Sequence, residues 1–285
     1  MRRGGLASLS AQAGRAAVDV GATAPSCPVV LKLGGRALEH EGAWRELAAA
    51  LRAMDEPVVL VHGGGAEVSG WCRRLGLTPS FVDGLRVTDA DTLEVAVAVL
   101  AGLANKRLVA ALRAAGIDAV GLSALDGGVV EARVHPQADR LGEVGAIEQV
   151  DPSLLHTLLA QGRVPVLASI VAGGGEGRLL NVNADDLASA IAVALRARAL
   201  LLMSDVPGLM LNGALVTRLS SEDAAIAMSG ADVTGGMRPK LEAARLALAS
   251  GVAAVHLAAW RGPSTLAELM NGTGAGTTLV TAEVK

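Results

Sequence analysis

The stretch VVLKLGG at residues 29–35, followed by VVLVHGGG at residues 58–65, decides the predicted fold. Each is a run of β-branched and aliphatic residues that ends in glycines, and each is followed by a helical pattern, at 42–54 and 66–75. Uninterrupted apolar runs of this length are typical of strands buried on both faces of a parallel sheet. The two units therefore predict strand, glycine turn and helix, twice in succession.

The same alternation continues along the rest of the chain. Further elements are predicted as a helix over 89–115, strands at 118–122 and 164–169, a helix over 181–197, a strand over 199–203, a helix over 234–250 and a strand over 252–257. Alternating strands and helices predict an α/β fold, a parallel sheet with helices on both faces. The glycine-rich segment 173–177 is the best candidate for a joint between two lobes.

Composition excludes several classes of protein. With 285 residues, 51% of them hydrophobic and 19% charged, the chain is long and apolar enough to bury a substantial core. The net charge of −3 and the lack of a basic cluster argue against nucleic acid or an anionic membrane as a partner. The longest uninterrupted apolar stretch, 95–104, is too short to span a bilayer. Small-molecule partners are therefore expected.

The first residues and the cysteines give weaker indications. Residues 1–27 are rich in Ala, Gly, Ser and Arg and are expected to form a disordered N-terminal extension, although this composition also resembles an organelle transit peptide. Two cysteines cannot build a disulfide framework, which favours a reducing compartment such as the cytoplasm. No metal site is predicted, because the five histidines are scattered.

Glycine clusters at the ends of two neighbouring strands suggest a phosphate site. Ligands of parallel sheets bind beyond the carboxyl ends of the strands, and glycines there let backbone N–H groups approach an anion. The alternative is that these glycines only form tight turns. Neither a P-loop pattern nor the GxGxxG pattern of dinucleotide-binding proteins occurs after a strand.

A few charged residues stand out against this background. The chain holds only four lysines among its 25 basic residues, and Lys32 lies inside an apolar strand, where it either extends to solvent or faces an anion. Lys240 follows Gly235-Gly236 at a predicted helix start, where it is either solvated or near an anion. Asp185 could be a helix cap, a role that Asp186 could also fill. Arg86 could be an exposed loop residue or a carboxylate ligand, and His62 a ligand or a local hydrogen-bonding residue.

Nine short motifs in one order give a more specific signal. They are KLGG at 32–35, HGGG at 62–65, GLRVTD at 84–89, ANK at 104–106, NVNAD at 181–185, SDVPG at 204–208, GGM-x-PK at 235–240, AWR at 259–261 and NG-x-x-x-GT at 271–277. Over about residues 28–282 the chain resembles the amino acid kinase family. The GLRVTD segment is similar to that of members that phosphorylate N-acetyl-L-glutamate.

The resemblance implies an overall architecture and a reaction. The fold is expected to be a three-layer α/β/α sandwich around a mainly parallel central sheet, with two lobes. Residues 28–175 would bind the acyl amino acid and form a homodimer, and residues 176–285 would bind ATP. The implied reaction transfers phosphate from ATP to the side-chain carboxylate of N-acetyl-L-glutamate, with Mg²⁺ held mainly by the ATP phosphates.

The resemblance also implies a role for each matched residue. Lys32 and Lys240 would neutralise the transferred phosphoryl group, and Asp185 would hold the two lysines. Substrate-binding residues would be Gly64, Gly65, Arg86 and Asn181. Phosphate- and nucleotide-binding residues would be Gly34, Gly35, Asp205, Val206, Pro207, Gly208, Leu209, Met210, Asp232, Val233 and Thr234.

Two alternatives stay open. The chain could phosphorylate another N-blocked acidic amino acid, such as N-succinylglutamate or a carrier-linked aminoadipate. It could also be a non-catalytic regulator that binds nucleotides or amino acids, although the presence of both lysines and Asp185 argues against this.

Overall fold

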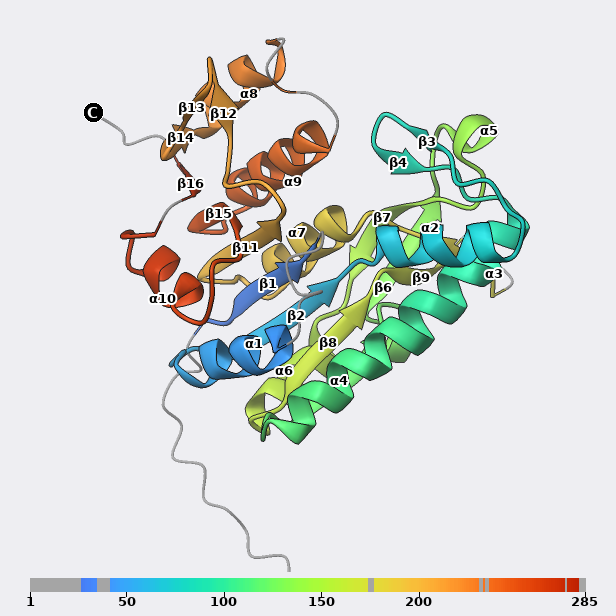
Figure 1. The fold of residues 1–285 in the computed structure, drawn as a ribbon, viewed down its shortest axis with the longest axis horizontal. Coiled ribbons are helices and arrows are strands. Elements are labelled where there is room, and N and C mark those ends of the chain that lie inside the picture. The colour runs from blue at the N-terminus through green and yellow to red at the C-terminus, as the bar shows by residue number, and fades with distance from the viewer. Residues whose placement is uncertain are drawn as a thin grey trace, which may run out of the picture.

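A central sheet of eight strands organises the protein, and every neighbouring pair in it except β15 and β16 is parallel (Figure 1). The computed structural model describes residues 27–34, 42–173, 177–230, 233, 236–274 and 276–281. In spatial order the strands are β14 (Arg218–Ser220), β16 (Thr277–Val280), β15 (Ala254–Ala259), β11 (Ala199–Ser204), β1 (Val29–Leu33), β2 (Val58–His62), β8 (Val164–Ala168) and β5 (Ala119–Ser123). The predicted mainly parallel sheet is confirmed.

Strand β1 is buried along its whole length. All five are buried, since helices cover both faces of the sheet. Val29 and Leu31 belong to the core on one face, whereas Val30 belongs to the core on the other. Side chains alternate along a strand, so Lys32 lies on the Val30 face.

Two layers of helices enclose the sheet. The Val29 and Leu31 face packs against α1 (Ala43–Arg52), α4 (Asn105–Ala114) and α10 (Thr265–Met270). The opposite face packs against α6 (Ser153–Ala160), α7 (Ala184–Ala194), α8 (Ser221–Met228) and α9 (Met237–Ala249). This confirms the predicted three-layer α/β/α arrangement, with β1 and β2 near its centre.

A second, four-stranded sheet was not predicted. Its order is β10 (Leu179–Asn181), β9 (Ile170–Gly173), β6 (Val130–Val134) and β7 (Gly145–Val150). It lies on the side of β2 and β8, away from β14 and α10 (Figure 1). The smaller elements are the hairpins β3 (Phe81–Val82) with β4 (Leu85–Arg86) and β12 (Met210–Leu211) with β13 (Ala214–Leu215), the helix α5 (Ala138–Leu141) and the 3₁₀ turn η2 (Asp126–Gly128).

The predicted joint at 173–177 lies between β9 and β10. These two strands are antiparallel neighbours in the small sheet, and residues 174–176 lie outside the described residues. The division into lobes therefore stays a prediction, as does the extension at 1–27, of which only Cys27 is described.

The predicted helix over 89–115 is confirmed, with one difference. Asp89 caps it by accepting a hydrogen bond from the Thr92 N–H at 2.8 Å, and helical structure runs through α3 (Ala90–Val97), the π-helical segment η1 (Ala98–Ala104) and α4. The π-helical middle was not predicted. By length and composition the whole helix is apolar enough to cross a membrane, with a mean hydropathy of 1.7 over 18 residues, of which 39% are buried. The longest uninterrupted apolar stretch covers only residues 95–104 of this helix, because isolated polar residues divide the rest of its apolar sequence.

His256 on β15 gives the protein a predictable acid sensitivity. Its side chain is 5% exposed, its Nδ1 lies 3.0 Å from Thr278 Oγ1, and burial lowers the pKa of His256 to about 4. An unfolded histidine has a pKa of about 6.5, so the unfolded chain takes up the proton first and stability falls as the pH drops below that value. Between pH 8 and pH 5 this linkage costs about 2 kcal/mol of unfolding free energy.

The His256→Asn variant removes this titration while keeping a polar partner for Thr278. We expect its unfolding free energy to fall about 2 kcal/mol less than that of the wild type between pH 8 and pH 5, measured by urea denaturation. Equal losses in both proteins would contradict the assignment. Exchange of the exposed His156 for asparagine is the matched control and should leave the pH dependence unchanged.

Candidate active site

Lys32 is a buried ammonium group at the carboxyl end of the central strand β1. Its side chain is 8% exposed, and its Nζ lies 2.8 Å from Asp185 Oδ1. Gly34, directly after the strand, leaves room for this group, because a Cβ at that position would collide with Lys32 Nζ and lie 2.9 Å from the Met203 carbonyl oxygen. The glycine of the KLGG motif therefore has a steric role next to the lysine.

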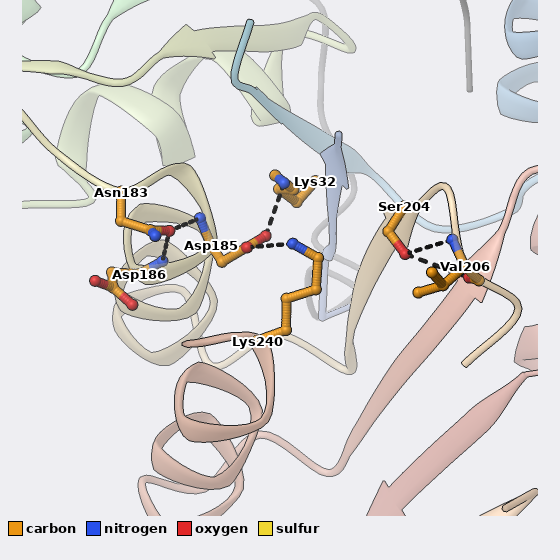
Figure 2. A network of polar contacts seen from close by, with 7 residues as sticks. All are labelled: Lys32, Asn183, Asp185, Asp186, Ser204, Val206 and Lys240. Carbon is orange, nitrogen blue, oxygen red and sulfur yellow. Dashed lines mark hydrogen bonds and ion pairs between the residues drawn. The ribbon is translucent and has the colours of Figure 1, made fainter. Parts of the chain in front are cut away.

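Asp185 joins Lys32 to a second lysine from another part of the chain. Its Oδ2 accepts a hydrogen bond of 2.7 Å from Nζ of Lys240, which lies in the first turn of α9. Figure 2 shows the carboxylate of Asp185 between the two ammonium groups. Three residues from β1, α7 and α9, widely separated in sequence, thus form one charged cluster, which we call the lysine cluster.

The charges in the lysine cluster shift the pKa values of Asp185 and Lys32. Burial by itself would raise the pKa of Asp185, but Lys32 and Lys240 outweigh it, and the pKa of Asp185 lies below its ordinary value. Burial lowers the pKa of Lys32, and Lys240 lowers it further, against the opposing effect of Asp185. One carboxylate cannot neutralise two ammonium groups. With both lysines protonated, the lysine cluster has a net charge of +1 and suits an anion.

Neither acid at the start of α7 is its cap, which corrects the sequence interpretation. Asn183 is the cap: its Oδ1 accepts hydrogen bonds from the N–H groups of Asp185 at 2.7 Å and Asp186 at 3.3 Å. The Asp185 carboxylate is therefore available to the lysines, and the exposed Asp186 points away from them (Figure 2). An asparagine two residues before the acids is the sequence signal for this cap.

Arg86 is a buried guanidinium with a free donor. It is 8% exposed, and its Nη2 donates to the Gly65 carbonyl oxygen at 2.6 Å and to Ser69 Oγ at 2.8 Å. Its guanidinium carbon lies 4.7 Å from the centre of the Phe81 ring. Nη1 has no hydrogen-bond partner among the described residues. A buried unpaired charge is costly, so a carboxylate that accepted a hydrogen bond from Arg86 Nη1 would stabilise the guanidinium.

Asn181 is tied to Arg86 through Thr88. Asn181 Nδ2 donates to Thr88 Oγ1 at 3.2 Å, and this hydroxyl donates to the Arg86 carbonyl oxygen at 3.1 Å. Thr88 is completely buried. The sequence does not indicate this link, although Thr88 lies in the GLRVTD motif, because a hydrogen bond between β10 and the loop after β4 is a tertiary contact.

The glycines after β2 contact both Arg86 and the residues at the start of α7. Gly64 precedes α2 (Gly65–Arg74), and Gly65 is its first residue. A Cβ on the preceding Gly63 would come within 3.5 Å of the Cβ of Ala184, the residue before Asp185. The structure therefore brings the predicted substrate-binding residues together beside the start of α7 and the lysine cluster.

The predicted nucleotide-binding turn follows β11, on the other side of β1. Gly208 has a φ of +151°, and a Cβ there would lie 2.6 Å from Thr277 Oγ1, so only glycine fits without strain. Leu209 is buried, and its N–H donates to Thr277 Oγ1 at 2.7 Å, which makes it a core residue. Val206 and Met210 are exposed apolar side chains.

The structure gives no information on the predicted nucleotide-binding role of several residues. Gly35, Asp232 and Thr234 lie outside the described residues, and the described Val233 is buried. Within the described part of the chain, no group of three or more His, Cys, Asp or Glu residues is arranged to hold a metal ion. A cavity of about 530 Å³ between β7, α7 and α9 has neither lysine of the cluster in its lining.

Comparison with known proteins decides the family. The family model described as the amino acid kinase family matches residues 28–259. The chain belongs to the amino acid kinase family. Similar members include the acetylglutamate kinase of Methanopyrus kandleri, 47% identical over 231 residues that cover 78% of this chain and 91% of that protein. The acetylglutamate kinase of Parasynechococcus marenigrum is 42% identical over 261 residues, 88% of each chain.

A solved structure has the same fold as this member of the amino acid kinase family. The crystal structure of smu.665 from Streptococcus mutans UA159 superimposes with a TM-score of 0.77 at 30% identity, and the match covers 89% of this chain and 98% of that one. The predicted family and fold class are thus confirmed.

Proposed function

We propose that this chain transfers the γ-phosphoryl group of ATP to the side-chain carboxylate of N-acetyl-L-glutamate, a step of arginine biosynthesis. The products are ADP and N-acetyl-L-glutamyl 5-phosphate. The observation that carries the proposal is the lysine cluster, with Asp185 between two lysines, beside a buried arginine that has a free donor. The acetylglutamate kinases at 42% and 47% identity support the choice of substrate.

The chemistry needs positive charge more than it needs a base. A glutamate side chain has a pKa of about 4.3, so the acceptor is already a carboxylate at pH 7. The obstacle is repulsion between this carboxylate and the ATP phosphates. An oxygen of the carboxylate bonds to the γ-phosphorus as the bond to the β–γ bridging oxygen breaks, and Lys32 and Lys240 would balance the charge on the phosphoryl oxygens.

The other predicted residues would position the two substrates. Arg86 would bind the α-carboxylate of the acceptor through Nη1, Asn181 its acylamino end, and Gly64 and Gly65 would donate backbone N–H groups. Gly34, Gly35 and the segments 205–210 and 232–234 would line the nucleotide site, although the side chains of Leu209 and Val233 are buried in the core. The exposed Val206 and Met210 offer an apolar surface for a base.

Mg²⁺ would be held mainly by ATP oxygens and water, as its coordination chemistry prefers. Each oxygen of Asp185 already lies against an ammonium group, so this carboxylate fits the lysines better than a metal ion. When bound, Mg²⁺ would neutralise phosphate charge. The protein's own contribution to charge neutralisation is the lysine pair.

A homodimer is part of the proposal, with residues 28–175 as the acceptor-binding and dimerisation lobe and 176–285 as the ATP-binding lobe. The long helix carries half-buried apolar residues such as Leu93, Val97 and Leu103. Strand β5 is an edge strand of the eight-stranded sheet among the described residues, and its Val120 and Leu122 are half-buried. A second copy that covers the helix and the edge would bury both. A cytoplasmic location suits an ATP-dependent biosynthetic step.

The substrate is tested by trapping the acyl phosphate as a hydroxamate. The purified full chain is incubated with Mg²⁺, ATP, hydroxylamine and, in parallel, N-acetylglutamate, N-succinylglutamate or free glutamate. We expect hydroxamate chiefly from N-acetylglutamate. Preference for another acceptor would change the substrate, and no hydroxamate from any acceptor would favour a non-catalytic regulator.

Arg86→Lys should separate substrate recognition from phosphoryl transfer. A compact ammonium cannot reproduce a guanidinium that holds both its protein partners and a carboxylate. Loss of part of a charged hydrogen-bond pair costs roughly 1.5–3 kcal/mol, so we expect KM for N-acetylglutamate to rise about 10- to 100-fold. KM for ATP should hardly change. Saturation curves for each substrate measure both constants.

The control for this variant is Arg113→Lys, which alters an arginine whose only described ion pair, with Asp118, is exposed. It should leave both KM values unchanged. If Arg86→Lys affected only ATP, the assignment of Arg86 to the acceptor would be wrong.

A further inference from the structure

His62, at the end of β2, is a buried side chain that the proposed chemistry leaves without a role. It is 4% exposed. Its Nδ1 lies 2.9 Å from the Gly63 carbonyl oxygen, and its Nε2 lies 3.0 Å from Nδ2 of Asn105, the first residue of α4. Both ring nitrogens are therefore engaged within the protein.

The partners of Asn105 fix the direction of these hydrogen bonds. Its Nδ2 also lies 3.2 Å from the Leu122 carbonyl oxygen and 2.9 Å from the Val166 carbonyl oxygen, and its Oδ1 accepts from Lys106 Nζ at 3.0 Å. The side-chain atom of Asn105 that faces the Leu122 and Val166 carbonyl oxygens must be the amide nitrogen, because both of these neighbours are acceptors. An amide N–H only donates, so His62 Nε2 must accept.

The tautomer of His62 follows. Nε2 carries no proton, so the neutral ring has its proton on Nδ1 and donates it to the Gly63 carbonyl oxygen. Burial lowers the pKa of His62 below its ordinary value, and Lys106 lowers it further, against the hydrogen bond to Gly63. A ring with both nitrogens occupied in this way cannot also act as a general base.

The consequence lies in the peptide unit between Gly63 and Gly64. In a planar trans peptide the C=O and N–H groups point in opposite directions. A carbonyl held toward His62 therefore turns the Gly64 N–H away from α4. Glycine has more backbone freedom than any other residue, so the Gly63-Gly64-Gly65 run needs such an external restraint to keep one orientation.

Close packing shows that the surroundings are built around this arrangement. A Cβ on Gly64 would lie 2.7 Å from Leu100 Cδ2, in the π-helical segment, and a Cβ on Gly121 would collide with Asn105 Oδ1. Asn105 itself is completely buried. Residues on the long helix thus contact the glycine loop at two points, through Leu100 and through Asn105 with His62.

We propose that His62, held by Asn105, is a positioning residue that locks the Gly63–Gly64 peptide so that the Gly64 N–H faces the reacting groups. The proposal rests on the proposed function, since it needs a reacting anion at this loop. It assigns a role to the histidine of HGGG and the asparagine of ANK. Neither side chain touches substrate.

Two substitutions separate this role from simple packing. His62→Leu keeps an apolar side chain but has no donor for the Gly63 carbonyl, and we expect kcat to fall about 10- to 100-fold with little change in KM for ATP. His62→Asn places an amide donor close to the Nδ1 position and should recover most of kcat. If His62→Leu had wild-type kcat, or if His62→Asn were no better than it, the proposal would be overturned.

The wild-type hydroxamate assay with N-acetylglutamate is run first, so a failure of the proposed function is visible before any variant is compared. His156→Leu, at an exposed histidine on α6, is the matched control and should keep full activity.

A spectroscopic measurement covers the case in which His62→Leu fails to fold. In the wild-type chain labelled with ¹⁵N-histidine, the resonances absent from the His62→Asn spectrum belong to His62. At pH 7.5 we expect the neutral form protonated on Nδ1. A form protonated on Nε2, or on both nitrogens, would contradict the proposal whatever the kinetics show.

Discussion

Lys32→Ala and Lys240→Ala should each lower kcat on the order of 10²–10³-fold, the usual loss when one preorganised charge-stabilising group is removed. KM for either substrate should change much less, because the positive charge matters most when charge develops on the phosphoryl oxygens. Steady-state kinetics of the purified variants measure both effects.

The two lysine variants should both stay folded, because each keeps one ion pair of the lysine cluster. Each variant leaves Asp185 with one ammonium partner, at 2.7 Å or 2.8 Å, so neither should unfold the protein. Arg113→Ala, which breaks the exposed ion pair with Asp118, is the control for loss of a positive charge. Full turnover in Lys32→Ala or in Lys240→Ala would remove that lysine from the mechanism.

Asp185→Asn should be about as harmful as loss of a lysine, with kcat reduced on the order of 10²–10³-fold. Without the carboxylate, two ammonium groups face each other in a buried site. Burial and Lys240 already lower the pKa of Lys32, and losing Asp185 lowers it further. The alkaline limb of the kcat profile should therefore move to lower pH, which a purely structural role would not cause.

The fold should survive this substitution, because the cap of α7 is Asn183. Asp186→Asn, at the exposed neighbour that points away from the lysines (Figure 2), is the matched control and should keep wild-type kcat. A large drop in Tm for Asp185→Asn, together with normal specific activity of the protein that stays folded, would show that Asp185 is structural.

The central sheet could be predicted from sequence, because its strands are local, continuous apolar runs. VVLKL and VVLVH are buried at every position, and glycines mark their ends. The small second sheet could not be predicted in this way. Its strand β6, VEARV, alternates buried and exposed residues. It pairs with β7 and with β9, and β9 lies about forty residues further along the chain.

The candidate site shows the same contrast. Lys32 and Lys240 were conspicuous as two of only four lysines, and the motifs suggested Asp185 as their partner. The links that hold the site together were not predictable, since Thr88 to Asn181 and His62 to Asn105 are hydrogen bonds between residues 93 and 43 positions apart. The capping role of Asn183 was not predicted, because Asp185 and Asp186 are also residue types that cap helices.

Oxygen transfer tests the central claim most directly. N-acetyl-L-glutamate with oxygen-18 in its side-chain carboxylate is incubated with the enzyme, Mg²⁺ and unlabelled ATP, and the product is trapped with hydroxylamine, which attacks the acyl carbon and expels phosphate. If the carboxylate attacks the γ-phosphorus, each phosphate released with hydroxamate contains one labelled oxygen. Hydroxamate accompanied only by unlabelled phosphate would contradict attack of the carboxylate on the γ-phosphorus. ADP formed without hydroxamate would show that the enzyme hydrolyses ATP and does not phosphorylate this acceptor.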